Sequence, residues 1–198
     1  MHAISRPTTP VMRKPLISNG VLGMFIFVFT EIMFFSAFIS AYLIIRSNES
    51  VWPPWGQPRL PIATTGFNTA VLIISGFLLV MAGRSFSNPD KEKKTKILFG
   101  LAIITGAFFV VFQGYEWANL INYGLTFKSS LYGSLFYLII GLHALHVVIA
   151  IIAMIYTYSR FISSTKGQVS STEFNTIQVL WLFVVGVWPI LYVLVYLI

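Results

Sequence analysis

Residues 20–45, GVLGMFIFVFTEIMFFSAFISAYLII, decide the fold, because they form a long apolar stretch that contains a single charged residue, Glu31. A helix needs about 20 mostly apolar residues to cross a bilayer, and this stretch exceeds that length. Four later stretches have the same character, at 62–83, 97–121, 131–158 and 174–198. Their continuity excludes barrel strands, which alternate polar and apolar residues over about ten positions. The sequence therefore predicts an all-α membrane protein with a bundle of five transmembrane helices.

The composition of the whole chain also indicates a membrane location. Hydrophobic residues make up 57% of the sequence and charged residues only 10%, with a mean hydropathy of +0.81. In a soluble domain about a quarter of the residues are charged. The first apolar stretch is longer than the apolar part of a cleaved signal peptide, about 7–15 residues, and no small-residue cleavage motif follows it. We expect it to remain in the mature protein.

The polar segments suggest a simple domain organisation. Residues 1–19 form an N-terminal tail, and residues 20–198 form one transmembrane domain whose connecting loops are too short to hold a soluble domain. The first loop contains the turn-forming sequence Trp52, Pro53 and Pro54. There is no cysteine, so disulfides and cysteine-ligated metals are excluded.

Lysine and arginine are unevenly distributed between the two sides of the predicted bundle. Ten lie in the tail and in the loops after the second and fourth helices, and three lie in the loops after the first and third helices. Because cytoplasmic loops are enriched in these residues, we expect the N-terminus in the cytoplasm and the C-terminus outside. The net charge of +7 then reflects topology and contact with anionic lipid headgroups, not binding of nucleic acid.

Glu31 lies near the middle of the first predicted helix, where a carboxylate is costly to desolvate. No charged residue accompanies it in its own helix, so any partner must come from another helix. Burial disfavours the ionised form, and a protonated acid can hold helices together through hydrogen bonds. A role in proton movement, or contact with lipid or another subunit, is also compatible with this position.

Three further acidic or histidine side chains lie within the predicted helices. Glu116 lies near the outer end of the third helix, and His143 and His146 lie near the middle of the fourth. The histidines are three residues apart and therefore project from the same side of their helix. No carboxylate or third histidine accompanies them in that helix, so the sequence predicts interhelical hydrogen bonds and no metal site.

Five motifs in order resemble subunit III of cytochrome c oxidase and its quinol oxidase relatives. The family has a glutamate followed by a Phe-Phe pair, a Trp-Pro-Pro loop, an Asn-Thr segment, a Gln and Glu at the end of a helix, and a Gly-x-His-x-Leu-His segment. The matching stretches here are 24–38, 51–56, 66–76, 112–117 and 132–148. Longer members have two more helices at the N-terminus, so this chain is similar to the short five-helix bacterial form.

The resemblance implies a non-catalytic subunit in the bacterial inner membrane. Such a subunit packs on the catalytic subunit I of a terminal oxidase, binds phospholipid, and supports proton uptake and the durability of the enzyme during turnover. Haem and copper would reside in partner subunits, and this chain would contribute no catalytic residue. By the same resemblance, Glu31 corresponds to the family's membrane-embedded glutamate. Glu116 is a second membrane-embedded carboxylate with a proton-related or structural role, and Asn68 and Gln113 join the two histidines as interhelical polar contacts.

The last helix departs from the family pattern. Leu182 stands where the family has a histidine, and Val185 where it has an aspartate. This departure is compatible with a divergent branch of the family or a related oxidase. Two alternatives also stay open, an accessory subunit of a nitric oxide reductase and a proton-coupled transporter. Transporters usually contain internal repeats and helices broken at the midplane, and neither is visible in the sequence. An independent enzyme would need a nucleophile, metal or cofactor constellation, and none is visible either.

Overall fold

The computed structural model describes residues 18–163 and 169–198 as five long helices and two short ones. The long helices are α1 (Asn19–Asn48), α2 (Ile62–Phe86), α3 (Glu92–Asn122), α4 (Leu131–Ser163) and α5 (Ser171–Leu191). The short helices are η1 (Pro89–Lys91), before α3, and η2 (Tyr192–Leu197), a π-helix that continues α5. All five long segments are long and apolar enough to cross a membrane, and the described residues contain no strand. The predicted five-helix transmembrane bundle is confirmed.

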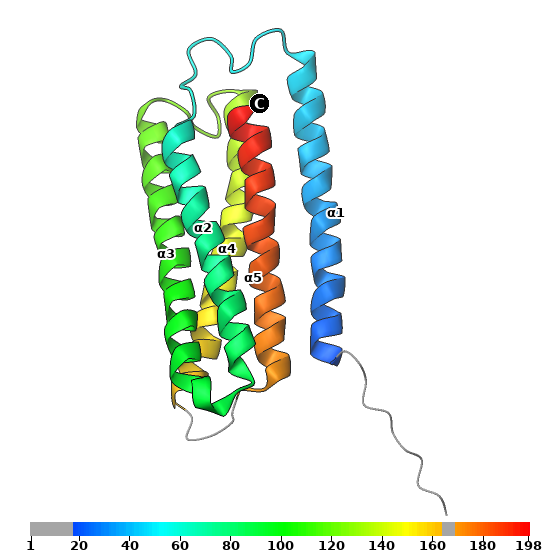
Figure 1. Ribbon diagram of the computed structural model, residues 1–198. Coiled ribbons are helices and arrows are strands. Elements are labelled where there is room, and N and C mark those ends of the chain that lie inside the picture. Colours follow the sequence, from blue (N-terminus) through cyan, green and yellow to red (C-terminus); the bar gives the residue numbers. More distant parts are fainter. Residues whose placement is uncertain (1–17, 164–168) are drawn as a thin grey trace, which may run out of the picture.

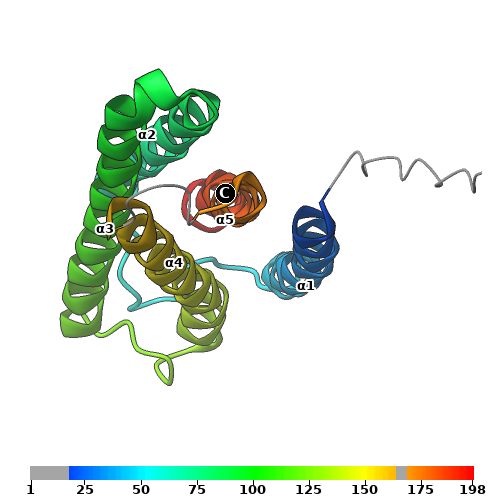
Figure 2. The ribbon, with the colours of Figure 1, turned by 90° about the horizontal axis from the view of Figure 1, so that it is seen from below.

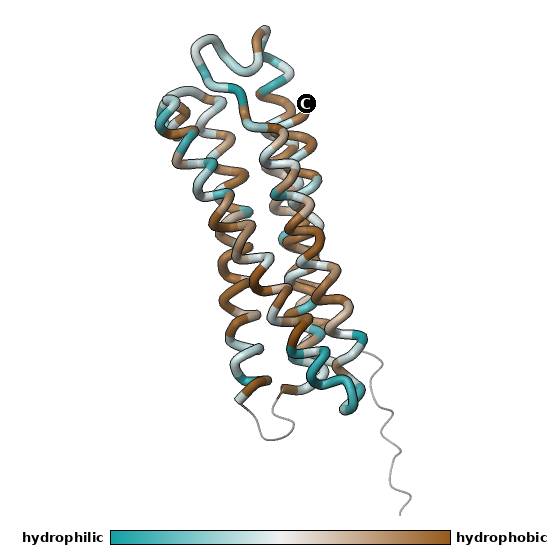
Figure 3. The backbone as a smooth tube through the Cα atoms, turned by 60° about the vertical axis from the view of Figure 1, so that its left-hand side comes forward, coloured by the Kyte–Doolittle hydropathy of each residue, from teal (hydrophilic) through white to brown (hydrophobic). Residues whose placement is uncertain are grey.

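The sidedness of the bundle remains a prediction. Almost all of the proposed cytoplasmic tail lies outside the described residues, and so does Lys166 in the loop after α4. Figure 3 shows the described part of the backbone with apolar residues along most of the helix lengths and hydrophilic residues gathered near the ends.

All five long helices extend beyond the stretches that hydropathy alone predicts, and α3, α4 and α5 are described here. α3 begins at Glu92, whose carboxylate pairs with Lys96 one turn later at 2.7 Å. α5 begins at Ser171, after Ser170 accepts a hydrogen bond from the backbone N–H of Glu173 at 3.1 Å. α4 continues to Ser163. Polar side chains at helix ends can satisfy backbone groups and favour the first turn, so a helix can extend into the headgroup region.

Helices α2 to α5 pack together, and α1 lies to one side of them (Figure 1). Seen along the helices, α1 flanks α5 and α4, while α2 and α3 form the opposite edge (Figure 2). In α1 only Phe35 and Tyr42 are buried, although the helix has 30 residues. Most of its surface is therefore left to lipid or to another protein.

Small residues allow α2, α3 and α5 to approach closely. The indole of Trp181 on α5 lies against Gly106 of α3, where an added Cβ would come within 2.7 Å of the ring. Trp181 Nε1 donates a hydrogen bond to Ser75 Oγ at 3.2 Å, and Ser75 Oγ donates to the carbonyl of Ala102 at 2.7 Å. Close contact of small residues and interhelical hydrogen bonds are the usual sources of helix association in lipid.

The loop between α1 and α2 is anchored by Trp52, one of its two tryptophans. Trp52 makes edge contacts with Tyr42 of α1, at a centroid distance of 5.8 Å, and with Tyr132 of α4, at 5.1 Å. The peptide bond between Trp52 and Pro53 is cis, and Pro53 and Pro54 are half-buried. The Trp-Pro-Pro segment thus lies over the C-terminal end of α1 and the N-terminal end of α4.

Substitution of Gly106 by alanine is expected to destabilise the bundle by about 1–3 kcal/mol, because the new methyl group would collide with the buried Trp181 ring. The measurement is the free energy of unfolding in titrations with a denaturing detergent. Gly114→Ala is the matched control on the same helix, since an added Cβ there meets nothing within 4 Å. Equal stability of the two variants would contradict this account of the packing.

Candidate functional site

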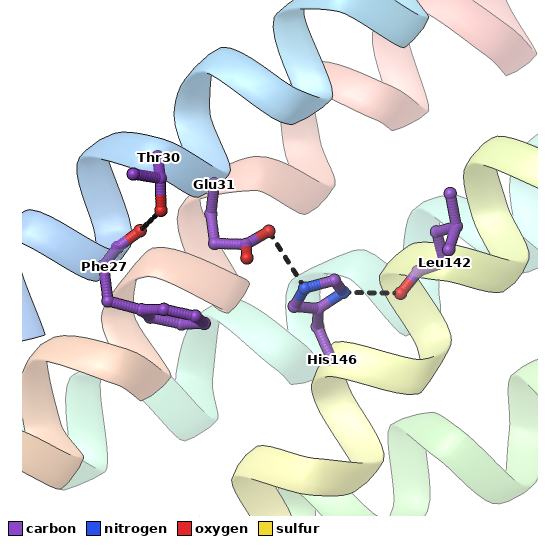
Figure 4. Close-up of polar contacts among 5 residues, drawn as sticks. All are labelled: Phe27, Thr30, Glu31, Leu142 and His146. Atoms are coloured by element: carbon purple, nitrogen blue, oxygen red, sulfur yellow. Dashed lines mark hydrogen bonds and ion pairs between the residues drawn. The ribbon is translucent and has the colours of Figure 1, made fainter.

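Glu31 finds its partner on α4. Its Oε2 lies 3.1 Å from Nε2 of His146, and each side chain is 17% exposed (Figure 4). Phe35 of α1 packs against the His146 ring at a centroid distance of 5.3 Å. The pair therefore lies at the edge of the bundle in mostly apolar surroundings, and it joins α1 to α4.

The second ring nitrogen of His146 limits the protonation states of the pair. Nδ1 lies 2.7 Å from the backbone carbonyl of Leu142 (Figure 4). A carbonyl oxygen can only accept, so Nδ1 carries a hydrogen in this arrangement. The contact between Nε2 and Glu31 then needs one more proton, either on the carboxyl group or on the ring. In both cases the pair shares a single proton.

His143 occupies a different environment from His146. It is buried, with 1% exposure, and stacks on Trp188 of α5 at a centroid distance of 5.0 Å. Trp188 Nε1 in turn donates a hydrogen bond to Thr69 Oγ1 of α2 at 2.8 Å. Residues three apart on a helix differ by about 60° around its axis, which is enough to turn His143 toward α5 and His146 toward α1.

A second polar cluster surrounds Glu116 between α2, α3 and η2. Thr65 Oγ1 donates to Glu116 Oε2 at 2.8 Å, and Gln113 Nε2 lies 3.5 Å from the same oxygen and 3.3 Å from the hydroxyl of Tyr196. Asn68 Nδ2 donates to the carbonyl of Phe109 at 3.1 Å and contacts Gln113 Oε1 at 3.4 Å. Asn68, Gln113 and Glu116 are therefore brought together, while Glu31 and His146 form a separate pair.

Several members of these clusters were not singled out from the sequence. Thr65 donates to Glu116, and Tyr196 accepts from Gln113. Trp188 stacks on His143 and donates to Thr69. The sequence of α2 could have indicated a polar cluster, because Thr65, Asn68 and Thr69 are spaced three and four residues apart and so share one face. The sequence of η2 gave no comparable signal, because Tyr196 also fits an interfacial aromatic residue.

The two departures in α5 are accommodated by apolar surroundings. Leu182 lines a groove of about 580 Å³ between α1 and α5, together with Phe25 and Ile32. Val185 is buried against Gly76 of α2, where an added Cβ would come within 3.1 Å of it.

The chemistry available to these clusters is limited to holding protons and hydrogen bonds. Among the described residues, no group of three or more histidine and acidic side chains could hold a metal ion. The remaining histidine, His2, lies outside the described residues. The arrangement can fasten helices together and can keep one exchangeable proton on the Glu31–His146 pair.

Thr65→Val is expected to lower the free energy of unfolding by about 1 kcal/mol, because the isosteric change removes the shortest hydrogen bond to Glu116. Thr64→Val is the matched control, since Thr64 is exposed and bonds only to the carbonyl of Pro61 in the preceding turn. Unfolding titrations in detergent would measure both. A Thr64 variant as unstable as the Thr65 variant would argue against a structural role of the Glu116 cluster.

Comparisons with known proteins agree with the five motifs. The family model described as cytochrome c oxidase subunit III matches residues 8–198. Cytochrome c oxidase subunit 3 of Synechocystis is 33% identical over 180 residues, which cover 89% of this chain and 75% of the relative. A probable cytochrome c oxidase subunit 3 of Mycobacterium leprae is 33% identical over 203 residues, covering 99% and 91%. The insect homologue of Drosophila yakuba is 29% identical over 180 residues, covering 88% and 67%. The chain is thus a multi-pass membrane protein that belongs to the cytochrome c oxidase subunit III family of the haem-copper oxidases.

Proposed function

We propose that this subunit packs on the catalytic subunit of a bacterial terminal oxidase, binds phospholipid, and supports proton uptake and the durability of the enzyme during oxygen reduction. The observation that carries the proposal is the Glu31–His146 pair, which shares one proton at the edge of the bundle. The electron donor is cytochrome c or a quinol, and haem and copper reside in partner subunits. The N-terminus faces the cytoplasm of the bacterial cell.

The proton is placed on Glu31 in this proposal. A neutral acid that donates to neutral Nε2 of His146 costs less in an apolar setting than a carboxylate beside an imidazolium, because two charges need not be desolvated. Each side chain keeps 17% exposure, so water or a neighbouring subunit can reach the pair. An acid that is protonated, partly exposed and hydrogen-bonded to a base is suited to exchange its proton.

The surface of α1 supports docking to a larger subunit. Phe29 is 64% exposed and Met33 is 60% exposed, on the helix that carries Glu31. We place the catalytic subunit against this helix, where it would cover large apolar side chains and lie next to the pair. The apolar groove between α1 and α5 has room for part of a lipid acyl chain.

Nothing in the fold favours the alternative of a transporter. Alternating-access transporters commonly have helices that are broken near the midplane. Here α1, α2, α3 and α4 are continuous over their full described lengths, and the π-helical segment η2 lies at the end of the chain.

Subunit membership is tested by purification through an N-terminal tag in mild detergent. We expect a large multi-span subunit in stoichiometric amounts and haem signals in the reduced-minus-oxidised optical spectrum. If the chain purifies alone and colourless from several detergents and from cells grown with ample oxygen, the proposed role in a terminal oxidase is wrong.

Glu31→Gln is expected to leave the assembly of the oxidase intact but to shorten its active lifetime during turnover several-fold. Glutamine can still donate to His146 Nε2, so the contact is kept while the exchangeable acidic proton is lost. The measurements are haem content, proton pumping and the decay of oxygen consumption with turnover number.

Thr30→Val is the matched control for the Glu31 variant. Thr30 is the neighbouring residue and bonds only to the carbonyl of Phe27 within α1, at 2.7 Å. Its lifetime should equal that of the wild type. Unchanged pumping and lifetime in Glu31→Gln would refute the proposed role of the pair.

A further inference from the structure

A pocket of about 260 Å³ lies between the beginning of α2 and the end of α3. These helices form the edge of the bundle opposite α1 (Figure 2). The pocket is therefore separate from the Glu31–His146 pair and from the groove between α1 and α5. Its polar and aromatic lining consists of an acid, a cation, an amide and three aromatic rings, namely Glu116, Arg59, Asn119, Phe112, Tyr115 and Tyr123.

One carboxyl oxygen of Glu116 has no partner. The side chain is buried, with 5% exposure, and both of its protein contacts, from Thr65 and Gln113, go to Oε2. Oε1 makes no hydrogen bond within the described parts of the chain and is shielded from water, so an occupant of the pocket reaches it when the carboxyl group turns toward the pocket. Because an unsatisfied polar atom inside a membrane is costly, the occupant of the pocket is expected to supply the missing bond.

The charges around the pocket are arranged for an occupant with both signs. Arg59, in the loop before α2, is exposed and lines the same pocket without forming an ion pair with Glu116. Phe112, Tyr115 and Tyr123 add aromatic faces, which attract ammonium groups. The pocket thus offers one site for a cation and another for an anion.

The depth of the pocket matches the headgroup region. Glu116 lies six residues before the end of α3 at Asn122, which corresponds to about 9 Å along the helix. The polar layer on each side of a bilayer is several ångströms thick. Arg59, in the loop, would lie at the level of the phosphates and Glu116 just below it.

We propose that this pocket binds the headgroup of a phosphatidylethanolamine, with the primary ammonium donating to Glu116 Oε1 and the phosphate paired with Arg59. A lysine side chain of a partner subunit could also reach Glu116, but Arg59 would repel it, whereas a zwitterion satisfies both groups. This inference extends the lipid binding proposed above to a particular site and lipid class. It does not depend on the role of Glu31.

The test uses the purified assembly in nanodiscs that contain equal amounts of phosphatidylethanolamine and phosphatidylglycerol. The assembly is released from the nanodiscs, and native mass spectrometry then counts the phosphatidylethanolamine molecules that remain bound to it. We expect one to be retained by the wild type and its retention to fall about tenfold in Glu116→Gln and in Arg59→Gln. Replacing phosphatidylethanolamine by phosphatidylcholine, which lacks N–H donors, should have a similar effect.

Two variants serve as matched controls. Glu49→Gln and Lys128→Gln remove the same charges from exposed positions in the loops on the same side of the bundle, away from the pocket. Their lipid retention should equal that of the wild type. Equal retention in all four variants, or no preference for phosphatidylethanolamine, would overturn the proposal.

A photoreactive benzoylphenylalanine in place of Asn119 distinguishes lipid from protein as the occupant. A cross-link to lipid supports the proposal, and a cross-link to another subunit overturns it. Haem content measured on the same samples reports separately on membership in the oxidase. If a variant loses lipid retention but keeps a normal haem content, the result concerns the lipid site and not membership in the oxidase. If the chain purifies without haem, its lipid retention can still be measured.

Discussion

The cost of leaving a polar group unpaired in hydrocarbon is the constraint on which this structure depends. Only 10% of the residues are charged, so a buried acid has few charged side chains with which it could pair. Glu31 meets the constraint by contact with His146, and Glu116 meets it at one of its two carboxyl oxygens by contact with Thr65 and Gln113. The first contact joins α1 to α4, and the contact between Thr65 and Glu116 joins α2 to α3. The polar residues that are expensive to bury therefore also specify how the helices associate.

The two acids meet this constraint in different ways. Glu116 is held in the core by donors from two helices, so it fixes the packing of α2 on α3. Glu31 sits at the edge of the bundle on a helix with only two buried residues, and its described polar contact to the other helices is to His146. A change in the proton shared by that pair would therefore bear directly on how α1 packs. The same helix is the one that we place against the catalytic subunit.

Much of the fold could be predicted from the sequence, because five long apolar stretches leave few alternatives to five spanning helices. Most of the helix ends could not, since polar residues continue all five long helices beyond the apolar stretches. The sequence placed Glu31 and both histidines at similar depths but did not choose between His143 and His146. That choice depends on a rotation of about 60° around α4, which only the packing of α1 and α5 against it determines. The involvement of Thr65 and Tyr196 likewise required the three-dimensional arrangement.

The central claim is that Glu31 is protonated and donates its hydrogen bond to His146. Infrared spectra of the purified assembly at neutral pH, recorded for the wild type and for Glu31→Gln, test it most directly. The account predicts that the wild type shows the carbonyl stretch of a protonated carboxylic acid and that the variant lacks this band. If the variant instead loses the bands of an ionised carboxylate, the pair is an imidazolium beside a carboxylate, and the account of a neutral shared proton is wrong.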